Sequence, residues 1–128
     1  MHSTYKSKGG LGRIFKAFRY SAQGLSAAIR HEAAFRQELF LALVLTPIAF
    51  WISRTVGELL LLLGTLVFVL VIELLNSAIE AIADAVTIEH HPLIGRAKDL
   101  GSAAVLLSLL FSAVVWLAVI GSIVLNRL

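Results

Sequence analysis

The residues best suited to chemistry stand in the segment ELLNSAIEAIADA, residues 73–85. Its polar side chains Glu73, Asn76, Glu80 and Asp84 follow the spacing i, i+3, i+7 and i+11. On an α-helix, which advances about 100° per residue, these positions lie on one stripe about 80° wide. Carboxyl groups aligned in this way could accept a proton from a substrate hydroxyl group or bind a metal ion.

Glu73 lies deeper in a hydrophobic segment than the other three. Residues 59–72 form a run of 14 uncharged residues, which makes about 21 Å of helix, whereas the bilayer core is about 30 Å thick. A helix that crosses the membrane from residue 59 therefore carries Glu73 within it. Because carboxylates at that depth are costly and usually face a bundle interior, we predict a functional role for Glu73. Solvated acids at a helix end would explain Asp84 well and Glu80 in part.

A second polar group is HEAAFRQE, residues 31–38. Glu32 and Arg36 are four residues apart and could simply pair on a helix, while Glu38 opens a hydrophobic run. We expect Glu32 at the same depth as Glu80, because it lies where a surface helix meets the first spanning segment. Two acids from different helices at one level make a plausible Mg²⁺ site.

A third polar group is GRAKD, residues 95–99, where the chain re-enters the membrane. Arg96, Lys98 and Asp99 could be an ordinary positively charged anchor with a helix N-terminus. They could equally bind a polyphosphate, helped by the N-terminus of the following helix. His90 and His91 stand beside this group, either as solvated loop residues or as contacts for a nucleotide.

The composition indicates which elements position these groups. Hydrophobic residues make up 59% of the 128 and charged residues 15%, against about 45–50% and about 25% in soluble proteins. We therefore predict an all-α membrane protein with one domain, residues 1–128, and membrane helices at about 32–53, 59–86 and 98–126. There is no cysteine, which excludes disulfides and Cys-ligated metals.

The N-terminal region predicts a different kind of helix. Residues 1–12 read as a flexible tail, and residues 13–30 as an amphipathic helix with aromatic and aliphatic residues opposite a basic face. Such a helix suits the membrane interface, although it could instead pack on a partner. Seven Lys and Arg residues precede the uncharged run that begins at Leu39. This bias places the N-terminus and the second connection in the cytoplasm and the C-terminus outside.

Together the three groups offer acids for a metal, cations for phosphates and a base at a lipid-facing depth, which are the parts of phosphoryl transfer. No P-loop or protein-kinase motif is present. A small proton or cation transporter could use Glu73, but would need an ionisable residue in the far half of a span. A purely structural subunit would leave the polar stripe and GRAKD unexplained.

At these residues the sequence resembles the small integral-membrane diacylglycerol kinase family of Gram-negative bacteria. The matching segments are EAAFRQE (32–38), ELLNSAIEAIADA (73–85) and GRAKDLGSAAV (95–105). The resemblance implies a homotrimer in the inner (cytoplasmic) membrane that transfers the γ-phosphoryl group of MgATP to diacylglycerol, giving phosphatidic acid, with no nucleic acid as partner. A related undecaprenol kinase remains an alternative, because an acyl chain and a polyprenyl chain both need only an apolar groove.

The resemblance also implies a role for each site residue. Glu73 is the expected general base and Asn76 holds it, while Glu32 and Glu80 bind the Mg²⁺ that accompanies ATP. The expected contacts with ATP are Arg13, Tyr20, Glu32, Glu80, Glu89, His90, His91, Lys98 and Asp99. The expected contacts with the lipid substrate are Arg13, Ala34, Phe35, Arg36, Gln37, Glu38, Glu73 and Ser102.

Overall fold

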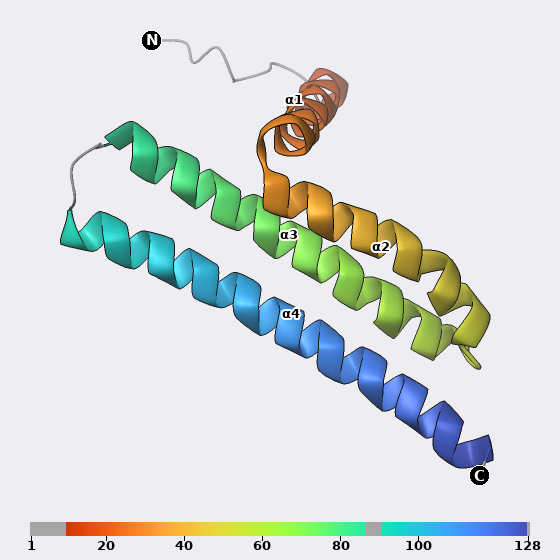
Figure 1. Cartoon of the computed structure of the whole chain (residues 1–128). Coiled ribbons are helices and arrows are strands. Elements are labelled where there is room, and N and C mark those ends of the chain that lie inside the picture. The colour runs from red at the N-terminus through yellow and green to blue at the C-terminus, as the bar shows by residue number, and fades with distance from the viewer. Residues whose placement is uncertain (1–9, 87–90, 128) are drawn as a thin grey trace.

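The computed structural model describes residues 10–86 and 91–127, and these form four helices (Figure 1). They are α1 (Gly10–His31), α2 (Ala33–Ile52), α3 (Val56–Val86) and α4 (Pro92–Arg127). The last three are long and apolar enough to cross a membrane. The predicted class, an all-α membrane protein with three spanning helices and one further N-terminal helix, is confirmed.

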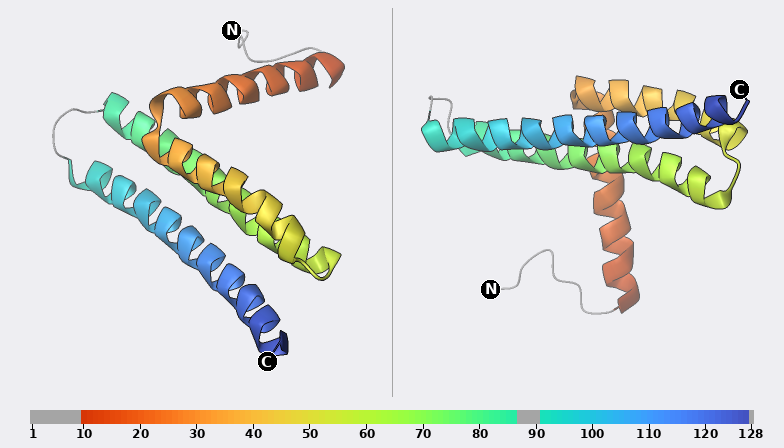
Figure 2. Two further views of the ribbon diagram at one scale, coloured as in Figure 1. Left: turned by 45° about the vertical axis from the view of Figure 1, so that its right-hand side comes forward. Right: turned by 90° about the horizontal axis from the view of Figure 1, so that it is seen from below.

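The three long helices run side by side, with α3 in contact with both α2 and α4 (Figures 1 and 2). Helix α2 has 20 residues, or about 30 Å, which matches the bilayer core. Helices α3 and α4 have 31 and 36 residues, or about 46 and 54 Å, which exceeds it. Both continue past the start of α2, so the α3–α4 end of the bundle extends beyond the junction of α1 and α2 (Figure 1).

Several helices begin earlier than the sequence pattern predicts. Helix α1 starts at Gly10, so residues 10–12, which we expected in the tail, are helical. Glycine disfavours helix formation, but Leu11 continues the apolar face of the helix by one turn. Helix α3 starts at Val56, where the hydroxyl oxygen of Thr55 accepts a hydrogen bond from the Glu58 amide at 3.1 Å. Such a cap extends a helix beyond its hydrophobic segment, where periodicity gives no signal.

Helix α4 likewise starts at Pro92 and not near residue 98. Proline suits the first position of a helix because its φ is already helical and it has no N–H group to satisfy. His91 precedes it, and its Nδ1 accepts a hydrogen bond from the Leu93 amide at 3.1 Å. Pro92 therefore begins a helix in a stretch that we expected to be a loop.

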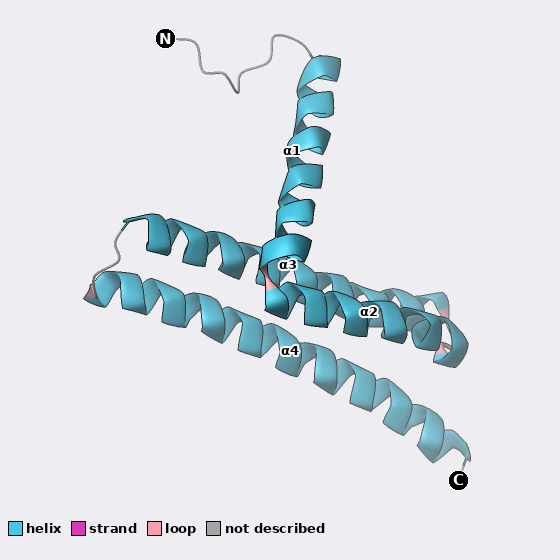
Figure 3. Ribbon diagram, turned by 45° about the horizontal axis from the view of Figure 1, so that its top comes forward, coloured by secondary structure: helices cyan, strands magenta, loops and turns pink. Residues whose placement is uncertain are grey.

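Helix α1 runs across the three long helices and projects from them (Figures 2 and 3). The break falls at Glu32, which has an extended backbone with φ −113° and ψ 104°. The guanidinium of Arg36 donates to the carbonyl oxygens of Ile29 at 3.0 Å and Arg30 at 3.2 Å. Arg36 thus satisfies carbonyl groups at the end of α1 that lack helical partners, and so fixes the corner between α1 and α2.

A small core joins the long helices in the half of the bundle away from α1. It is built from Ala42, Ala49, Leu62, Leu66, Trp116 and Val119. The indole N–H of Trp116 donates to the hydroxyl oxygen of Thr65 at 3.2 Å, and Thr65 donates to the carbonyl of Leu62 at 2.8 Å. At most 28% of the most apolar stretch of any long helix is buried within the chain, so most of the apolar surface faces outward.

Candidate active site

The predicted polar stripe of α3 faces the bundle at one end and leaves it at the other. Glu73 is 4% exposed and Asn76 is 9% exposed. Glu80 is half-buried and Asp84 is exposed. The stripe therefore runs from a buried carboxyl group to a solvated one along a single helical face, toward the end where α3 and α4 extend beyond the corner.

The buried end of the stripe contacts a second acid. The carboxyl group of Glu38, from α2, is hydrogen-bonded to that of Glu73. Among the described residues, Glu38 Oε2 has no protein donor. A hydrogen bond between two carboxyl groups requires a proton on one of them, so the buried Glu73 and the half-buried Glu38 can hold one negative charge between them.

The sequence marks Glu38 as unusual but does not reveal its contact with Glu73. The signal was a charged residue at the start of a hydrophobic run. The pairing depends on how far α2 is shifted along α3, and neither helix alone encodes that shift. Phe35, one turn earlier on α2, is 2% exposed and helps to set it by packing inside the chain.

Asn76 connects the buried end of the stripe to Glu80. Its amide nitrogen donates to Glu80 Oε1 at 3.4 Å. Its amide oxygen is buried and has no partner in the described part of the chain. That oxygen faces Gly101 of α4, which is also buried. Asn76 is thus held between α3 and α4 while it contacts the neighbouring acid.

The predicted metal ligands lie near Glu73, on two different elements. Glu32 stands at the α1–α2 corner and Glu80 on α3, and both are close enough to repel a negative charge on Glu73. Residues 10–86 and 91–127 contain no cluster of three or more potential metal ligands. Two carboxylates fit a Mg²⁺ ion that takes its remaining ligands from phosphates and water.

A groove beside Glu32 separates α1 from α3. It has a volume of about 670 Å³ and is lined mainly by small residues, together with His31, Glu32 and Ser77. Its walls include Ala78 and Ala81, which flank Glu80 on α3. The groove is open to the outside and leads along the corner toward the predicted metal ligands.

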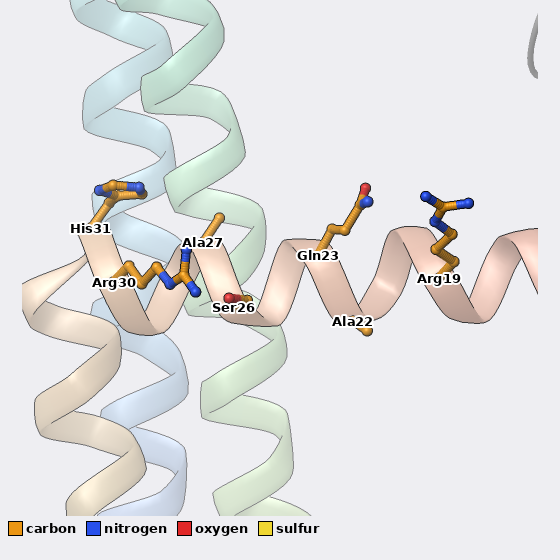
Figure 4. Close-up of a pocket in the computed structure, with 7 residues that line it drawn as sticks. All are labelled: Arg19, Ala22, Gln23, Ser26, Ala27, Arg30 and His31. Atoms are coloured by element: carbon orange, nitrogen blue, oxygen red, sulfur yellow. The ribbon is translucent and has the colours of Figure 1, made fainter.

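The basic side of α1 faces the same end of the bundle. Figure 4 shows Arg19, Gln23 and His31 projecting from α1 toward the end where α3 finishes and α4 begins. Together with Ala22, Ser26, Ala27 and Arg30 they line a hollow of about 440 Å³. Cationic side chains on this side could attract an anionic substrate such as a nucleotide.

Lys98 is tied to the exposed end of the stripe. Its ammonium group forms an ion pair with Asp84 at 2.6 Å and also interacts electrostatically with the carboxyl group of Glu80. Arg96 and Asp99 are exposed. His91 accepts the Leu93 amide and so helps to start α4. Glu89 and His90, two of the predicted nucleotide contacts, lie outside the described residues.

The other predicted contacts are exposed on the surface of the single chain. Arg13 lies in the first turns of α1, the part farthest from the long helices (Figure 3). Tyr20, on the same helix, is 45% exposed. Ala34, Gln37 and Ser102 are exposed on the bundle. Arg36 is engaged with the end of α1.

Comparison with known proteins decides the family. The profile of the family described as "Prokaryotic diacylglycerol kinase" matches residues 19–120. The chain belongs to this family. It is 46% identical over 118 residues to a diacylglycerol kinase of Pseudomonas aeruginosa, covering 92% of this chain and 96% of that protein.

Two further relatives agree. The Haemophilus influenzae diacylglycerol kinase is 43% identical over 107 residues, which cover 84% of this chain and 91% of that protein. The protein of the same name from Escherichia coli K12 is 46% identical over 107 residues, covering 84% and 88%. The predicted family and the predicted enzyme class, an ATP-dependent diacylglycerol kinase, are therefore confirmed. Every predicted site residue except Arg13 lies inside the matched range.

Proposed function

We propose that this kinase phosphorylates diacylglycerol at the level of Glu73, with Glu73 as the general base and MgATP as the donor. The observation that carries the proposal is a buried Glu73 hydrogen-bonded to Glu38, one helical turn from an asparagine that contacts Glu80. A buried acid that shares a proton with a neighbour can act as a base when the neighbour holds that proton.

In the proposed reaction the hydroxyl oxygen of the lipid attacks the γ-phosphorus of ATP. The bond between that phosphorus and the β–γ bridging oxygen breaks, and ADP leaves with the electron pair. Glu73 accepts the hydroxyl proton as the new P–O bond forms, and Glu38 keeps the shared proton so that the pair starts with only one charge. Positioning and charge neutralisation are the main contributions of a protein to this chemistry.

Glu32 and Glu80 would hold Mg²⁺, which shields the negative charge of the transferred phosphoryl group. Asn76 supports this arrangement because its amide nitrogen contacts Glu80 and so fixes that carboxyl group. Lys98 stands close to Glu80 and could bind a phosphate oxygen once ATP competes with Asp84. The basic side of α1 would attract the nucleotide to this end of the bundle (Figure 4).

We place the α3–α4 end of the bundle and the basic side of α1 in the cytoplasm of the cell, where ATP is available. The lysine and arginine bias of the sequence supports this orientation. The ends of α3 and α4 beyond the α1–α2 corner support it too, because both helices are longer than the thickness of the bilayer core. The kinase is then a multi-pass protein of the inner membrane whose C-terminus lies outside.

A homotrimer is part of the proposal. One chain leaves most of its apolar surface outward, and the start of α1, which carries Arg13, projects away from the long helices (Figure 3). Packing against helices of other copies would cover polar groups and could bring a neighbour's α1 to the site. Sedimentation of the kinase in micelles should give the mass of three chains, whereas a fully active monomer would overturn this part.

The substrate is tested by phosphate transfer from radiolabelled MgATP in mixed micelles that contain diacylglycerol or undecaprenol. We expect labelling of diacylglycerol, and its loss in Glu73→Gln. Preference for undecaprenol would keep the mechanism and change the substrate. A folded sample that labels neither lipid would contradict the proposal.

A further inference from the structure

Gly101 of α4 stands where an added side chain would displace Asn76. A Cβ atom added to it would overlap the amide oxygen of Asn76 and would lie 3.3 Å from the Asn76 Cγ. Gly64 of α3 and Gly121 of α4 differ, since a Cβ at either would meet nothing within 4 Å. Among the described residues no glycine has a positive φ. The need for glycine at position 101 is therefore a need for space and not for an unusual backbone.

The space at Gly101 is occupied by a side chain of the proposed active site. The Asn76 amide oxygen is buried against Gly101, and it has no hydrogen-bond partner in the parts of the chain that the structure describes. The amide nitrogen at the other end of the same group donates to Glu80 Oε1 at 3.4 Å. Because the amide is rigid and planar, any displacement of its oxygen also displaces the nitrogen that contacts Glu80.

We propose that Gly101 is a positioning residue for phosphoryl transfer: its bare Cα lets Asn76 sit against α4 and hold Glu80 in place. This inference rests on the roles proposed above for Asn76 and Glu80. It assigns a function to a residue with no polar group, one turn after Lys98 on the same helix. Gly101 acts through Asn76, so it needs no contact with ATP or lipid.

The rival explanation is that Gly101 only lets α3 and α4 pack closely. Both explanations predict damage from Gly101→Ala, but only the positioning role requires that the damage pass through Asn76. A double-mutant cycle separates the two. In Asn76→Ala the amide is gone and a methyl group at position 101 has room, so the second substitution should then cost nothing more.

The experiment measures kcat, the KM for diacylglycerol and the Mg²⁺ concentration for half-maximal rate. The variants are Gly101→Ala, Asn76→Ala, their double variant and Gly121→Ala as the matched control in the same helix. We expect Gly101→Ala to lower kcat about 10- to 100-fold and to raise the Mg²⁺ requirement, with little change in the KM for lipid. Gly121→Ala should stay within about twofold of the unchanged kinase, as expected away from a site.

The double variant decides the inference, and it should fold and work as well as Asn76→Ala alone even if Gly101→Ala fails to fold. A double variant that is misfolded, or clearly less active than Asn76→Ala, would mean that Gly101 acts on packing. If Asn76→Ala is impaired but Gly101→Ala is not, the inference alone is wrong. If Asn76→Ala is fully active, the proposed role of Asn76 fails, and the inference fails with it.

Discussion

Two carboxyl groups in contact inside a helix bundle are stabilised when they share one proton, and this determines what Glu38 and Glu73 can each do. Glu73 was expected to be functional because it lies within a hydrophobic run, and its 4% exposure agrees with that. Its partner could not be predicted, since Glu38 is 35 positions away on a different helix. The sequence pattern identifies a charged residue within an apolar segment. The contacts between helices identify the partner of that residue.

Substitutions at Glu38 should lower kcat less than substitution of Glu73, if Glu38 only supports the base. Glu38→Gln keeps a hydrogen-bond donor beside Glu73, so we expect it to lower kcat by about tenfold or less, whereas loss of the base costs about 10²–10⁴-fold. Glu38→Ala removes the hydrogen-bond partner of Glu73 and should be more damaging than Glu38→Gln. Steady-state kinetics of the folded variants test this order. Equal and complete loss in Glu38→Gln and Glu73→Gln would mean that the carboxyl group of Glu38 is as necessary as that of Glu73, which contradicts a merely supporting role.

At the scale of the helices, the hydrophobic pattern predicts where the spans lie but not how they begin. The starts of α3 and α4 are set by Thr55 and by His91 with Pro92. The corner after α1 is set by Arg36, which could equally have paired with Glu32 on sequence grounds. These are local hydrogen bonds to backbone groups, and they depend on where the chain turns in three dimensions.

The ion pair between Asp84 and Lys98 joins the end of α3 to the start of α4, and it should matter more for ATP than for stability. Both side chains are partly exposed, and such pairs contribute little to stability. We expect Asp84→Asn to leave the melting temperature nearly unchanged and the KM for ATP unchanged or lower, because Lys98 is released. Lys98→Gln should raise that KM about tenfold, as expected for the loss of one charge-assisted contact with a phosphate. If Asp84→Asn raises the KM for ATP as much as Lys98→Gln does, ATP binding requires the intact ion pair, and the prediction is wrong.

At the scale of the whole molecule, the single chain is incomplete as a globular unit. Its long helices expose apolar side chains to lipid or to other copies, and α1 exposes Phe15 by 79% and Phe18 by 73%. Composition predicts a membrane protein well, because a high fraction of apolar residues indicates that lipid surrounds the chain. Composition cannot predict that α1 lies across the other helices at its junction with α2, where Glu32 stands (Figure 2). That placement brings the basic side of α1 to the same end as Lys98.

The orientation can be tested directly because the sequence contains no cysteine. A single cysteine in place of Val56, at the start of α3, should react with a membrane-impermeant maleimide added to spheroplasts. A cysteine in place of Leu93, at the start of α4, should react only after the membrane is opened. Both positions are exposed, by 72% and 59%, so accessibility within the protein is not limiting. The reverse pattern of labelling would contradict the proposed topology.

The central claim is that Glu73 accepts the proton of the lipid hydroxyl group while Glu80 serves the metal. It is tested most directly by comparing Glu73→Gln with Glu80→Gln in folded kinase, at saturating diacylglycerol and varied Mg²⁺. We expect Glu73→Gln to lower kcat about 10²–10⁴-fold at every Mg²⁺ concentration. Glu80→Gln should instead shift the Mg²⁺ dependence to higher concentrations. A Glu73→Gln variant that keeps most of its kcat, or that recovers it with added Mg²⁺, would show that Glu73 is not the base.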